Sequence, residues 1–308
     1  MSANLLIVEG KTMYKEKLSG VFVPAITPFA NDEILYERLA DNIKKFNQTR
    51  IRGYLALGSN GENKSLTMDE KLKVLEVFVK NKGGKVIMAG TGCESTKETV
   101  SFSREAIKIG VDFVSVLTPS YFAKQIKDET LIDYYTEIAE SVSVPILMYN
   151  APGFAGGVKI SPKAAGKLAS HKNIIGMKDS STDGIMGYLA ATRDVEDFYV
   201  IAGSANFFLT GLMCGATGGI LSLANAFPEI CCELYDKFIA GRTKEAVDLH
   251  FKVFNLNTKV SGSGGVSAVK AAATIAGYYG GEPRKPLLPL PEDKVEEIRK
   301  YLMGEGLV

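Results

Sequence analysis

Short apolar runs rich in β-branched residues alternate with longer amphipathic stretches between residues 21 and 223. The intervening stretches repeat apolar residues at helical spacing, as at Leu72, Leu75 and Val79. Such an alternation predicts βα units around a parallel sheet. The predicted strands cover residues 21–26, 54–57, 86–90, 113–117, 145–149, 174–178, 199–202 and 219–223.

These eight strands span about 25 residues per βα unit, close to what a (β/α)8 barrel requires, whereas a doubly wound open sheet is the alternative. Beyond residue 226 the alternation ends, and helices are predicted at 228–240, 243–258, 266–276 and 292–302. We therefore predict an α/β fold, a (β/α)8 TIM barrel over residues 21–225. An N-terminal segment, 1–20, precedes it, and a C-terminal helical extension, 226–308, packs on it.

Helix starts are marked between the predicted strands. Residues 67–70 (TMDE) and 95–98 (STKE) fit the capping box, in which a hydroxyl and a carboxylate each accept a backbone N–H. Ser161 followed by proline supplies another N-cap. These signals support the assignment of helices between the strands.

The charges nearly cancel, with 36 Lys and Arg against 35 Asp and Glu among 308 residues. No overall field therefore draws the protein to nucleic acid or to an anionic membrane, and small molecules are the expected partners. With two histidines and four cysteines that form no C-x-x-C pair, we expect neither a metal centre nor a disulfide framework. The apolar run at 5–8 is too short for a signal peptide, so we expect a cytoplasmic protein.

In a parallel barrel the reactive groups gather at the carboxyl ends of the strands. After the second predicted strand comes the turn 58–62 (GSNGE), whose backbone amides can approach an anion, although an ordinary tight turn has the same pattern. The fifth strand ends at Tyr149, which places a phenol at the mouth of the barrel, although a buried structural tyrosine fits the same position.

Lys178 ends the sixth predicted strand, in the sequence IIGMKD. A lysine directed into a barrel mouth is partly desolvated, which disfavours its charged form and frees the amine as a nucleophile; the alternative is a lysine that reaches solvent. Lys270 lies in an apolar stretch of the extension, away from the strand ends, and Lys64 lies farther out on a loop. Lys178 is therefore the preferred nucleophile. The glycines at 203 and 215–219 also fit a phosphate site, or close packing at the rim.

Three motifs together, 58–62 (GSNGE), 149–152 (YNAP) and 176–180 (GMKDS), resemble the dihydrodipicolinate synthase and N-acetylneuraminate lyase family. The resemblance runs from about residue 21 to residue 286, with the motifs in the family's order. It implies a class I aldolase that needs no cofactor and forms a Schiff base with pyruvate. It also implies a homotetramer built from tight dimers.

Carried over by position, Lys178 resembles the lysine that forms the imine, Tyr149 the tyrosine that shuttles the proton, and Ser59 the hydroxyl residue that relays it. Tyr121 matches a tyrosine that family members insert into a neighbouring subunit's site. The amides of Ser59 and Asn60 resemble the cradle for the pyruvate carboxylate. Two further positions, Gly203 and Ile220, match residues that line the family's pocket.

The identity of the second substrate depends on a few positions. Dihydrodipicolinate synthases have an arginine after the fifth strand, where this chain has residues 152–156 (PGFAG) and no cation, so loss of a carboxylate partner disfavours aspartate semialdehyde. Sialic acid lyases place acidic residues where this chain has 203–206 (GSAN). Residues 58–62, 88–96 and 277–281 look most like the aldolases of 4-hydroxy-2-oxoglutarate and of 2-keto-3-deoxy sugar acids. Phe154 replaces a polar residue at the position that would hold a second carboxylate, so a neutral or sugar-derived aldehyde fits as well as glyoxylate.

We therefore predict a pyruvate-forming lyase of the 4-hydroxy-2-oxoglutarate or 2-keto-3-deoxy sugar acid type. The alternatives are a dihydrodipicolinate synthase, which condenses pyruvate with aspartate semialdehyde, a Schiff-base dehydratase or decarboxylase of a deoxy-keto sugar acid, and a non-catalytic binding barrel. The choice of aldehyde depends on a few side chains that line the pocket.

Overall fold

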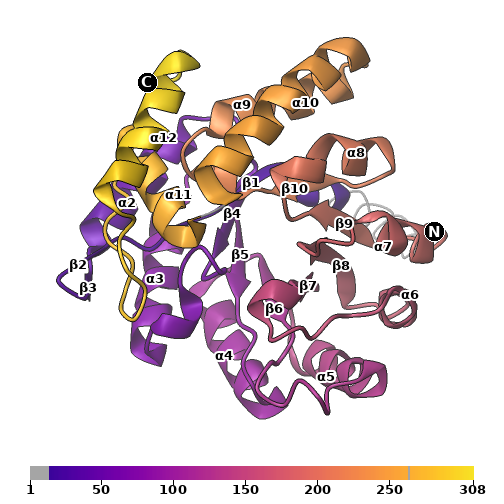
Figure 1. Ribbon diagram of the computed structural model, residues 1–308. Coiled ribbons are helices and arrows are strands. Elements are labelled where there is room, and N and C mark those ends of the chain that lie inside the picture. Colours follow the sequence, from indigo (N-terminus) through magenta and orange to yellow (C-terminus); the bar gives the residue numbers. More distant parts are fainter. Residues whose placement is uncertain (1–13, 263) are drawn as a thin grey trace.

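Eight parallel strands close into a barrel in the computed structural model, which describes residues 14–262 and 264–308 (Figure 1). Strand β1 pairs with both β10 and β4, which closes the sheet and rules out the open-sheet alternative. The predicted (β/α)8 barrel is therefore confirmed. Its strands are β1 (Gly20–Pro24), β4 (Gly53–Ala56), β5 (Val86–Gly90), β6 (Phe113–Leu117), β7 (Ile146–Asn150), β8 (Ile174–Asp179), β9 (Tyr199–Ala202) and β10 (Gly218–Ile220).

The last strand is shorter than predicted. Residues 219–223 were expected to be extended, but β10 ends at Ile220 and a 3-10 turn, η4 (Ser222–Asn225), follows. The Asn225 side chain explains the turn, because its amide donates to the Pro24 carbonyl at 3.0 Å and its oxygen accepts from the Ile26 N–H at 3.1 Å. A buried side chain that satisfies the end of β1 in this way requires the chain to bend after β10.

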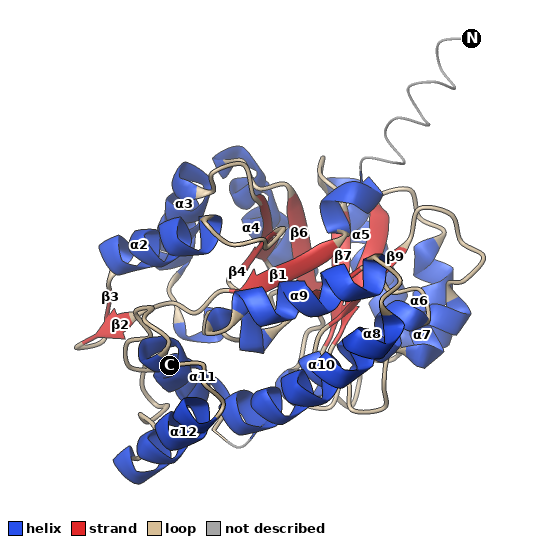
Figure 2. Ribbon diagram, turned by 90° about the horizontal axis from the view of Figure 1, so that it is seen from above, coloured by secondary structure: helices blue, strands red, loops and turns tan. Residues whose placement is uncertain are grey.

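Helices cover the outside of the barrel, and a small hairpin of β2 (Phe29–Ala30) and β3 (Glu33–Ile34) precedes the first of them (Figure 2). Thr67 forms the predicted capping box, and the Ser161 hydroxyl accepts from the Ala164 N–H at 3.0 Å. The covering helices are α2 (Tyr36–Asn47), α3 (Met68–Asn81), α4 (Thr96–Ile109), α5 (Asp128–Ser141), α6 (Pro162–Ala169), α7 (Met186–Ala191), α8 (Phe208–Met213) and α9 (Pro228–Ile239). Short 3-10 turns follow several strands: η1 (Asn63–Ser65), η2 (Pro152–Phe154) and η3 (Ala205–Phe207).

The four helices predicted after residue 226 are present. Helix α9 packs on β1, and α10 (Thr243–Asn257) packs on α9. A π-helical turn, η5 (Thr258–Gly262), leads towards α11 (Gly265–Ile275), which contacts η4 and α12 (Glu292–Gly304). Because η4 follows the carboxyl end of β10, this contact brings the C-terminal part of the chain to the mouth of the barrel (Figure 1).

The barrel interior is filled by alternate strand residues, as the two-residue period of a strand requires. Ile220 belongs to this interior cluster, with Phe22 and Leu147. Of the predicted N-terminal segment, residues 1–13 and their apolar run lie outside the described residues. Within the described part of the chain, no helix has both the length and the apolar character that crossing a membrane requires.

Candidate active site

Lys178 and Tyr149 lie side by side at the carboxyl ends of adjacent strands. They are register partners between β8 and β7, and the Lys178 Nζ lies 4.1 Å from the centre of the Tyr149 ring. Lys178 is 3% exposed and Tyr149 is 4% exposed. The lysine therefore does not extend into solvent, and its amine is held against the phenol in a buried site.

The phenol of Tyr149 has a perturbed pKa. Burial alone would raise it, but the charge of Lys178 and hydrogen bonds with Ser59, Lys178 and Ser180 outweigh burial and hold the pKa below its usual value of 10.0. The Ser59 Oγ lies 3.4 Å from the Tyr149 hydroxyl, so a hydrogen bond joins β7 to the turn after β4. A buried phenol that ionises more easily than in water is suited to proton transfer.

The turn after β4 holds two backbone N–H groups that have no hydrogen-bond partner in the described part of the chain. Both of its ends have left-handed backbone conformations, with φ 58° at Leu57 and φ 54° at Glu62. None of the hydrogen bonds among the described residues uses the amide N–H of Ser59 or of Asn60. Two adjacent free N–H groups in a tight turn form a site for an anion such as a carboxylate.

Side chains from other elements fix this turn. The Thr27 hydroxyl donates to the Gly61 carbonyl at 2.8 Å, and the Asn60 side chain donates to the Ser222 hydroxyl at 2.8 Å. Ser222 belongs to η4, which follows β10, and only β1 lies between β10 and β4 in the sheet. The turn is thus tied to the segments after β1 and β10, which limits its movement.

A cavity of about 500 Å³ opens beside the turn. Ser59, Asn60 and Tyr149 line one part of it, residues 264–267 line another, and Phe154, with 63% of its surface exposed, lies at its edge. This lining does not include three of the predicted site residues. Lys178 lies against Tyr149, Gly203 follows β9, and Ile220 is buried in the barrel. A side chain at Gly203 would collide with Ser180 and Asp179, so close packing explains this glycine.

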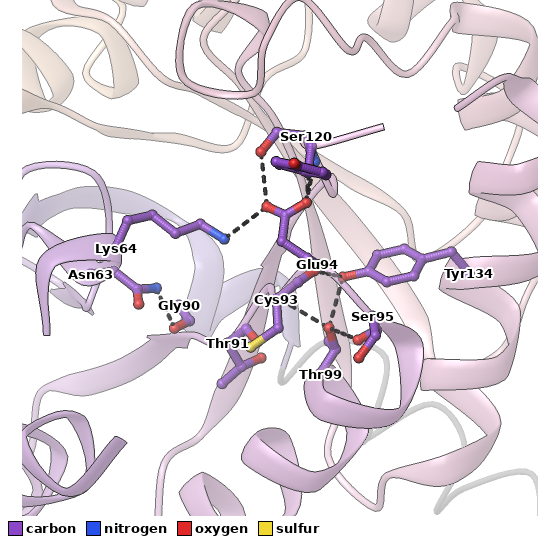
Figure 3. Close-up of polar contacts among 11 residues, drawn as sticks. Asn63, Lys64, Gly90, Thr91, Cys93, Glu94, Ser95, Thr99, Ser120 and Tyr134 are labelled. Carbon is purple, nitrogen blue, oxygen red and sulfur yellow. Dashed lines mark hydrogen bonds and ion pairs between the residues drawn. The ribbon is translucent and has the colours of Figure 1, made fainter. Parts of the chain in front are cut away.

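Lys64 also lines the cavity, which corrects the sequence-based placement of this residue farther out on a loop. Its amine pairs with Glu94 at 3.3 Å (Figure 3). The Glu94 carboxylate also accepts the N–H groups of Ser120 and Tyr121, at 2.8 and 2.9 Å, and the Ser120 hydroxyl at 2.8 Å. Burial alone would raise its pKa, but these donors and Lys64 lower it to about 2. The carboxylate thereby joins the segments after β4 and β6.

Tyr121 is not brought into the buried group of Lys178, Tyr149 and Ser59. It is 81% exposed, and its ring makes an edge-to-face contact with Phe122, which is 63% exposed. Within this chain, Tyr121 is therefore a surface residue whose backbone is anchored by Glu94.

Asp179 is a buried residue of the site that the sequence analysis did not assign. Its carboxylate accepts from the Asn150 amide at 2.7 Å and from the Ser181 hydroxyl at 3.0 Å. Burial raises its pKa, against the hydrogen bonds from Asn150 and Ser181. This network links the residues that follow Tyr149 and Lys178, and a carboxylate directly after a strand-end lysine is the signal that could have identified it.

The extension contributes a second buried lysine. Lys270 was expected to lie away from the strand ends, but its Nζ is 2.5 Å from the Glu62 carboxylate, in the turn after β4. Burial lowers the pKa of Lys270 to about 8, against the opposing effect of Glu62. The expectation failed because distance along the sequence hides the return of α11 to the barrel mouth.

Comparisons with known proteins agree with this fold. Residues 17–304 match the model of the dihydrodipicolinate synthetase family. A 4-hydroxy-tetrahydrodipicolinate synthase of Methanospirillum hungatei is 35% identical over 92% of this chain and 98% of its own length. A synthase of the same name from Methanopyrus kandleri is 32% identical over 95% of this chain and 98% of its own length.

Solved structures give the same result. A dihydrodipicolinate synthase from Thermotoga maritima superposes with a TM-score of 0.89, at 28% identity, over 95% of this chain and 100% of that one. A dihydrodipicolinate synthase from Aquifex aeolicus superposes with a TM-score of 0.88, at 29% identity, over 94% and 98% of the two chains. The protein is therefore an enzyme, a lyase, and it belongs to the dihydrodipicolinate synthetase family.

Proposed function

We propose that the protein is a pyruvate-dependent lyase in which Lys178 forms a Schiff base with the keto acid. The neutral amine attacks the ketone carbon and a C–N bond forms, while the ketone oxygen takes one proton from the amine and one from the Tyr149 phenol and leaves as water. The electron pair of a bond at the adjacent carbon, C–H in condensation or C–C in cleavage, then moves into the iminium and gives an enamine instead of a free carbanion. In condensation the Tyr149 phenolate takes up the proton of that C–H bond. The observation that carries this proposal is the buried contact between Lys178 and Tyr149.

Tyr149 and Ser59 are proposed to move the protons. In the cleavage direction, Tyr149 removes the proton of the substrate hydroxyl while the aldehyde departs and the bonding electrons enter the iminium. In the condensation direction, the enamine carbon attacks the aldehyde and the proton returns to the new hydroxyl. Ser59, 3.4 Å from Tyr149, relays the proton between the phenol and the cavity.

The free amides of Ser59 and Asn60 are proposed to hold the keto acid carboxylate, which fixes the ketone for attack. Phe154 lies at the edge of the same cavity, where it contacts the distal part of a larger substrate. Gly203 and Ile220 shape the neighbouring strand ends without lining the cavity. No cofactor takes part in this proposal, because the iminium supplies the electron sink.

The first candidate for the complete reaction is condensation of pyruvate with aspartate semialdehyde. It is supported by the relatives, which are named 4-hydroxy-tetrahydrodipicolinate synthases. This reaction, given as an alternative in the sequence analysis, is better supported than the aldol cleavage predicted there.

The second candidate is cleavage of 4-hydroxy-2-oxoglutarate or of a 2-keto-3-deoxy sugar acid into pyruvate and an aldehyde. One observation favours it. The turn η2 (Pro152–Phe154) contains no cation, and Phe154 lies at the cavity edge in a segment where a synthase needs a partner for the semialdehyde carboxylate. Dehydration of a deoxy-keto sugar acid would begin from the same imine.

Borohydride trapping tests the common step. Incubation with pyruvate and borohydride should leave one reduced pyruvate on Lys178, located by peptide mass spectrometry, and Lys178→Ala should take up none. An unmodified Lys178 in the intact enzyme would falsify the proposal. Product analysis then separates the candidates, because cleavage releases pyruvate and an aldehyde, condensation consumes both, and dehydration conserves the carbon chain.

The assembly is proposed to be a homotetramer built from tight dimers, in the cytosol, with the exposed Tyr121 entering the site of a neighbouring copy. Mixing tests this role. Tyr121→Ala and Lys178→Ala subunits, each inactive alone, should regain part of the activity when they assemble together, because one mixed site then holds both side chains. If the mixture stays inactive although hybrids form, Tyr121 acts in the active site of its own subunit or in no active site.

A further inference from the structure

Lys270 and Glu62 form an ion pair that is almost completely buried. The Lys270 Nζ lies 2.5 Å from Glu62 Oε1, and the two side chains are 1% and 2% exposed. The same amine donates to the Glu282 carbonyl at 2.7 Å and lies 4.5 Å from the centre of the Phe29 ring. Because the desolvation of two charges largely cancels their attraction, stability alone is a weak reason for such a pair.

Glu62 belongs to the turn that holds the free amides. Its own N–H donates to the Ser59 carbonyl at 3.1 Å, and its backbone has a left-handed conformation, with φ 54°. A residue other than glycine keeps that conformation only when its surroundings hold it. The Glu62 carboxylate provides this hold, because Oε1 meets Lys270 while Oε2 accepts the Arg284 N–H at 2.8 Å.

Lys270 also joins two walls of the cavity. It lies in α11, whose first turn and the residues before it, 264–267, line the cavity together with Val269. The turn from Ser59 to Glu62 lines another wall. The ion pair therefore sets where the C-terminal segment lies relative to the turn.

We propose that Lys270 is a positioning residue for the keto acid: through Glu62 it holds the amide N–H groups of Ser59 and Asn60 where the substrate carboxylate binds. This inference rests on the proposed Schiff-base function, since it assigns to that site a second lysine that forms no bond with the substrate. The group that Lys270 helps to bind is the carboxylate of an α-keto acid. Loss of Lys270 should therefore weaken binding of the keto acid more than it slows the reaction steps.

The test compares Lys270→Met, Glu62→Gln and the double variant in the full-length enzyme, by borohydride trapping at Lys178 over a range of pyruvate concentrations. Each single variant should raise the half-saturating pyruvate concentration roughly 10- to 100-fold, because small displacements of a binding group cost factors of this size. The half-saturating concentration for trapping with acetone, which has the ketone but no carboxylate, should change by less than about twofold. The substitutions weaken only the binding of the carboxylate, which acetone does not have.

The double variant separates positioning from stability. It leaves no unpaired buried charge, so it should recover most of the melting temperature lost in the single variants, yet its half-saturating pyruvate concentration should stay high. If Lys270→Met does not fold, the double variant still tests the positioning role of Lys270. A matched control is Lys82→Met, which breaks the Lys82–Asp112 pair of 3.1 Å before β5 and should leave pyruvate binding unchanged.

Two results would overturn the inference: a folded Lys270→Met variant with unchanged half-saturation for pyruvate, or a double variant that recovers both melting temperature and pyruvate binding. An adduct on Lys270 in place of Lys178 would overturn it as well. By contrast, the absence of any adduct in the unaltered enzyme overturns the proposed function itself, so the two failures are distinguishable.

Discussion

Tyr149 and Lys178 face each other across one step of the barrel sheet, with the lysine amine 4.1 Å from the centre of the phenol ring. Their separation is fixed by the register of β7 and β8, which also pairs Asn150 with Asp179 one residue further on. The Asn150–Asp179 hydrogen bond of 2.7 Å locks this register at the strand ends. The proposed nucleophile and proton carrier are held by backbone pairing and burial, so they need little rearrangement when the substrate arrives.

The first prediction concerns the hydroxyl of Tyr149. Tyr149→Phe keeps the ring beside Lys178 but removes the proton carrier, so kcat should fall about 10²- to 10⁴-fold, the usual contribution of general acid–base catalysis. Lys178 should still be trapped with pyruvate and borohydride. Steady-state kinetics and mass spectrometry measure the two effects.

The control for this variant is Tyr54→Phe. Tyr54 is also buried, and its hydroxyl donates to Asn47 Oδ1 at 2.7 Å, but it does not line the cavity. Its substitution should leave kcat nearly unchanged. Equal losses of kcat in the two variants would show that a buried hydroxyl, and not proton transfer by Tyr149, is what matters.

The second prediction concerns pH. The charge of Lys178 and the hydrogen bonds to the phenol outweigh burial and hold the pKa of Tyr149 below 10.0, so the phenolate increases as pH rises through a value lower than for a free tyrosine. If the phenolate is the base, kcat/KM for cleavage rises with pH and levels off below pH 10.0. Tyr149→Phe should lose this rise, and a profile that is identical in both enzymes would assign it to another group.

A third prediction addresses Glu94, which anchors the backbone of the Tyr121 segment (Figure 3). In Glu94→Ala the N–H groups of Ser120 and Tyr121 lose their acceptor, and Lys64 loses its partner. Amide hydrogen exchange at residues 120 and 121 should accelerate, and kcat should fall roughly tenfold if Tyr121 must be aimed at a site.

Glu98→Ala is the matched control for Glu94. It removes a nearby carboxylate from the first turn of α4 that makes no contact with the Tyr121 segment among the described residues. Exchange at residues 120 and 121 should stay slow in this variant. Unchanged exchange in Glu94→Ala would mean that other contacts hold the segment.

Much of this architecture could be predicted from local patterns. Strand-sized apolar runs and the Thr67 capping box are local features, and the carboxyl-end rule placed Lys178 and Tyr149 together because strand neighbours in a barrel follow chain order. The Lys270–Glu62 pair and the link from Lys64 through Glu94 to Ser120 could not be predicted in this way. They join distant segments through single side chains, and no periodicity in the sequence reports such contacts.

The last prediction tests the second substrate through Phe154, which is 63% exposed at the cavity edge in a turn without a cation. Phe154→Arg introduces a planar donor pair that suits a carboxylate. We expect kcat/KM for condensation with aspartate semialdehyde to rise about tenfold relative to a neutral aldehyde, since hydrogen bonds to charged groups contribute roughly 1.5–3 kcal/mol. Pyruvate trapping at Lys178 should be unchanged, and exposure of the site should limit the stability change to about 0.5 kcal/mol.

Phe154→Leu, which changes size without charge, should not alter the ratio of the kcat/KM values for the two aldehydes. If Phe154→Arg leaves that ratio unchanged while the parent enzyme already prefers aspartate semialdehyde, the semialdehyde carboxylate is held elsewhere in the cavity, and the absence of a cation in η2 no longer favours aldol cleavage.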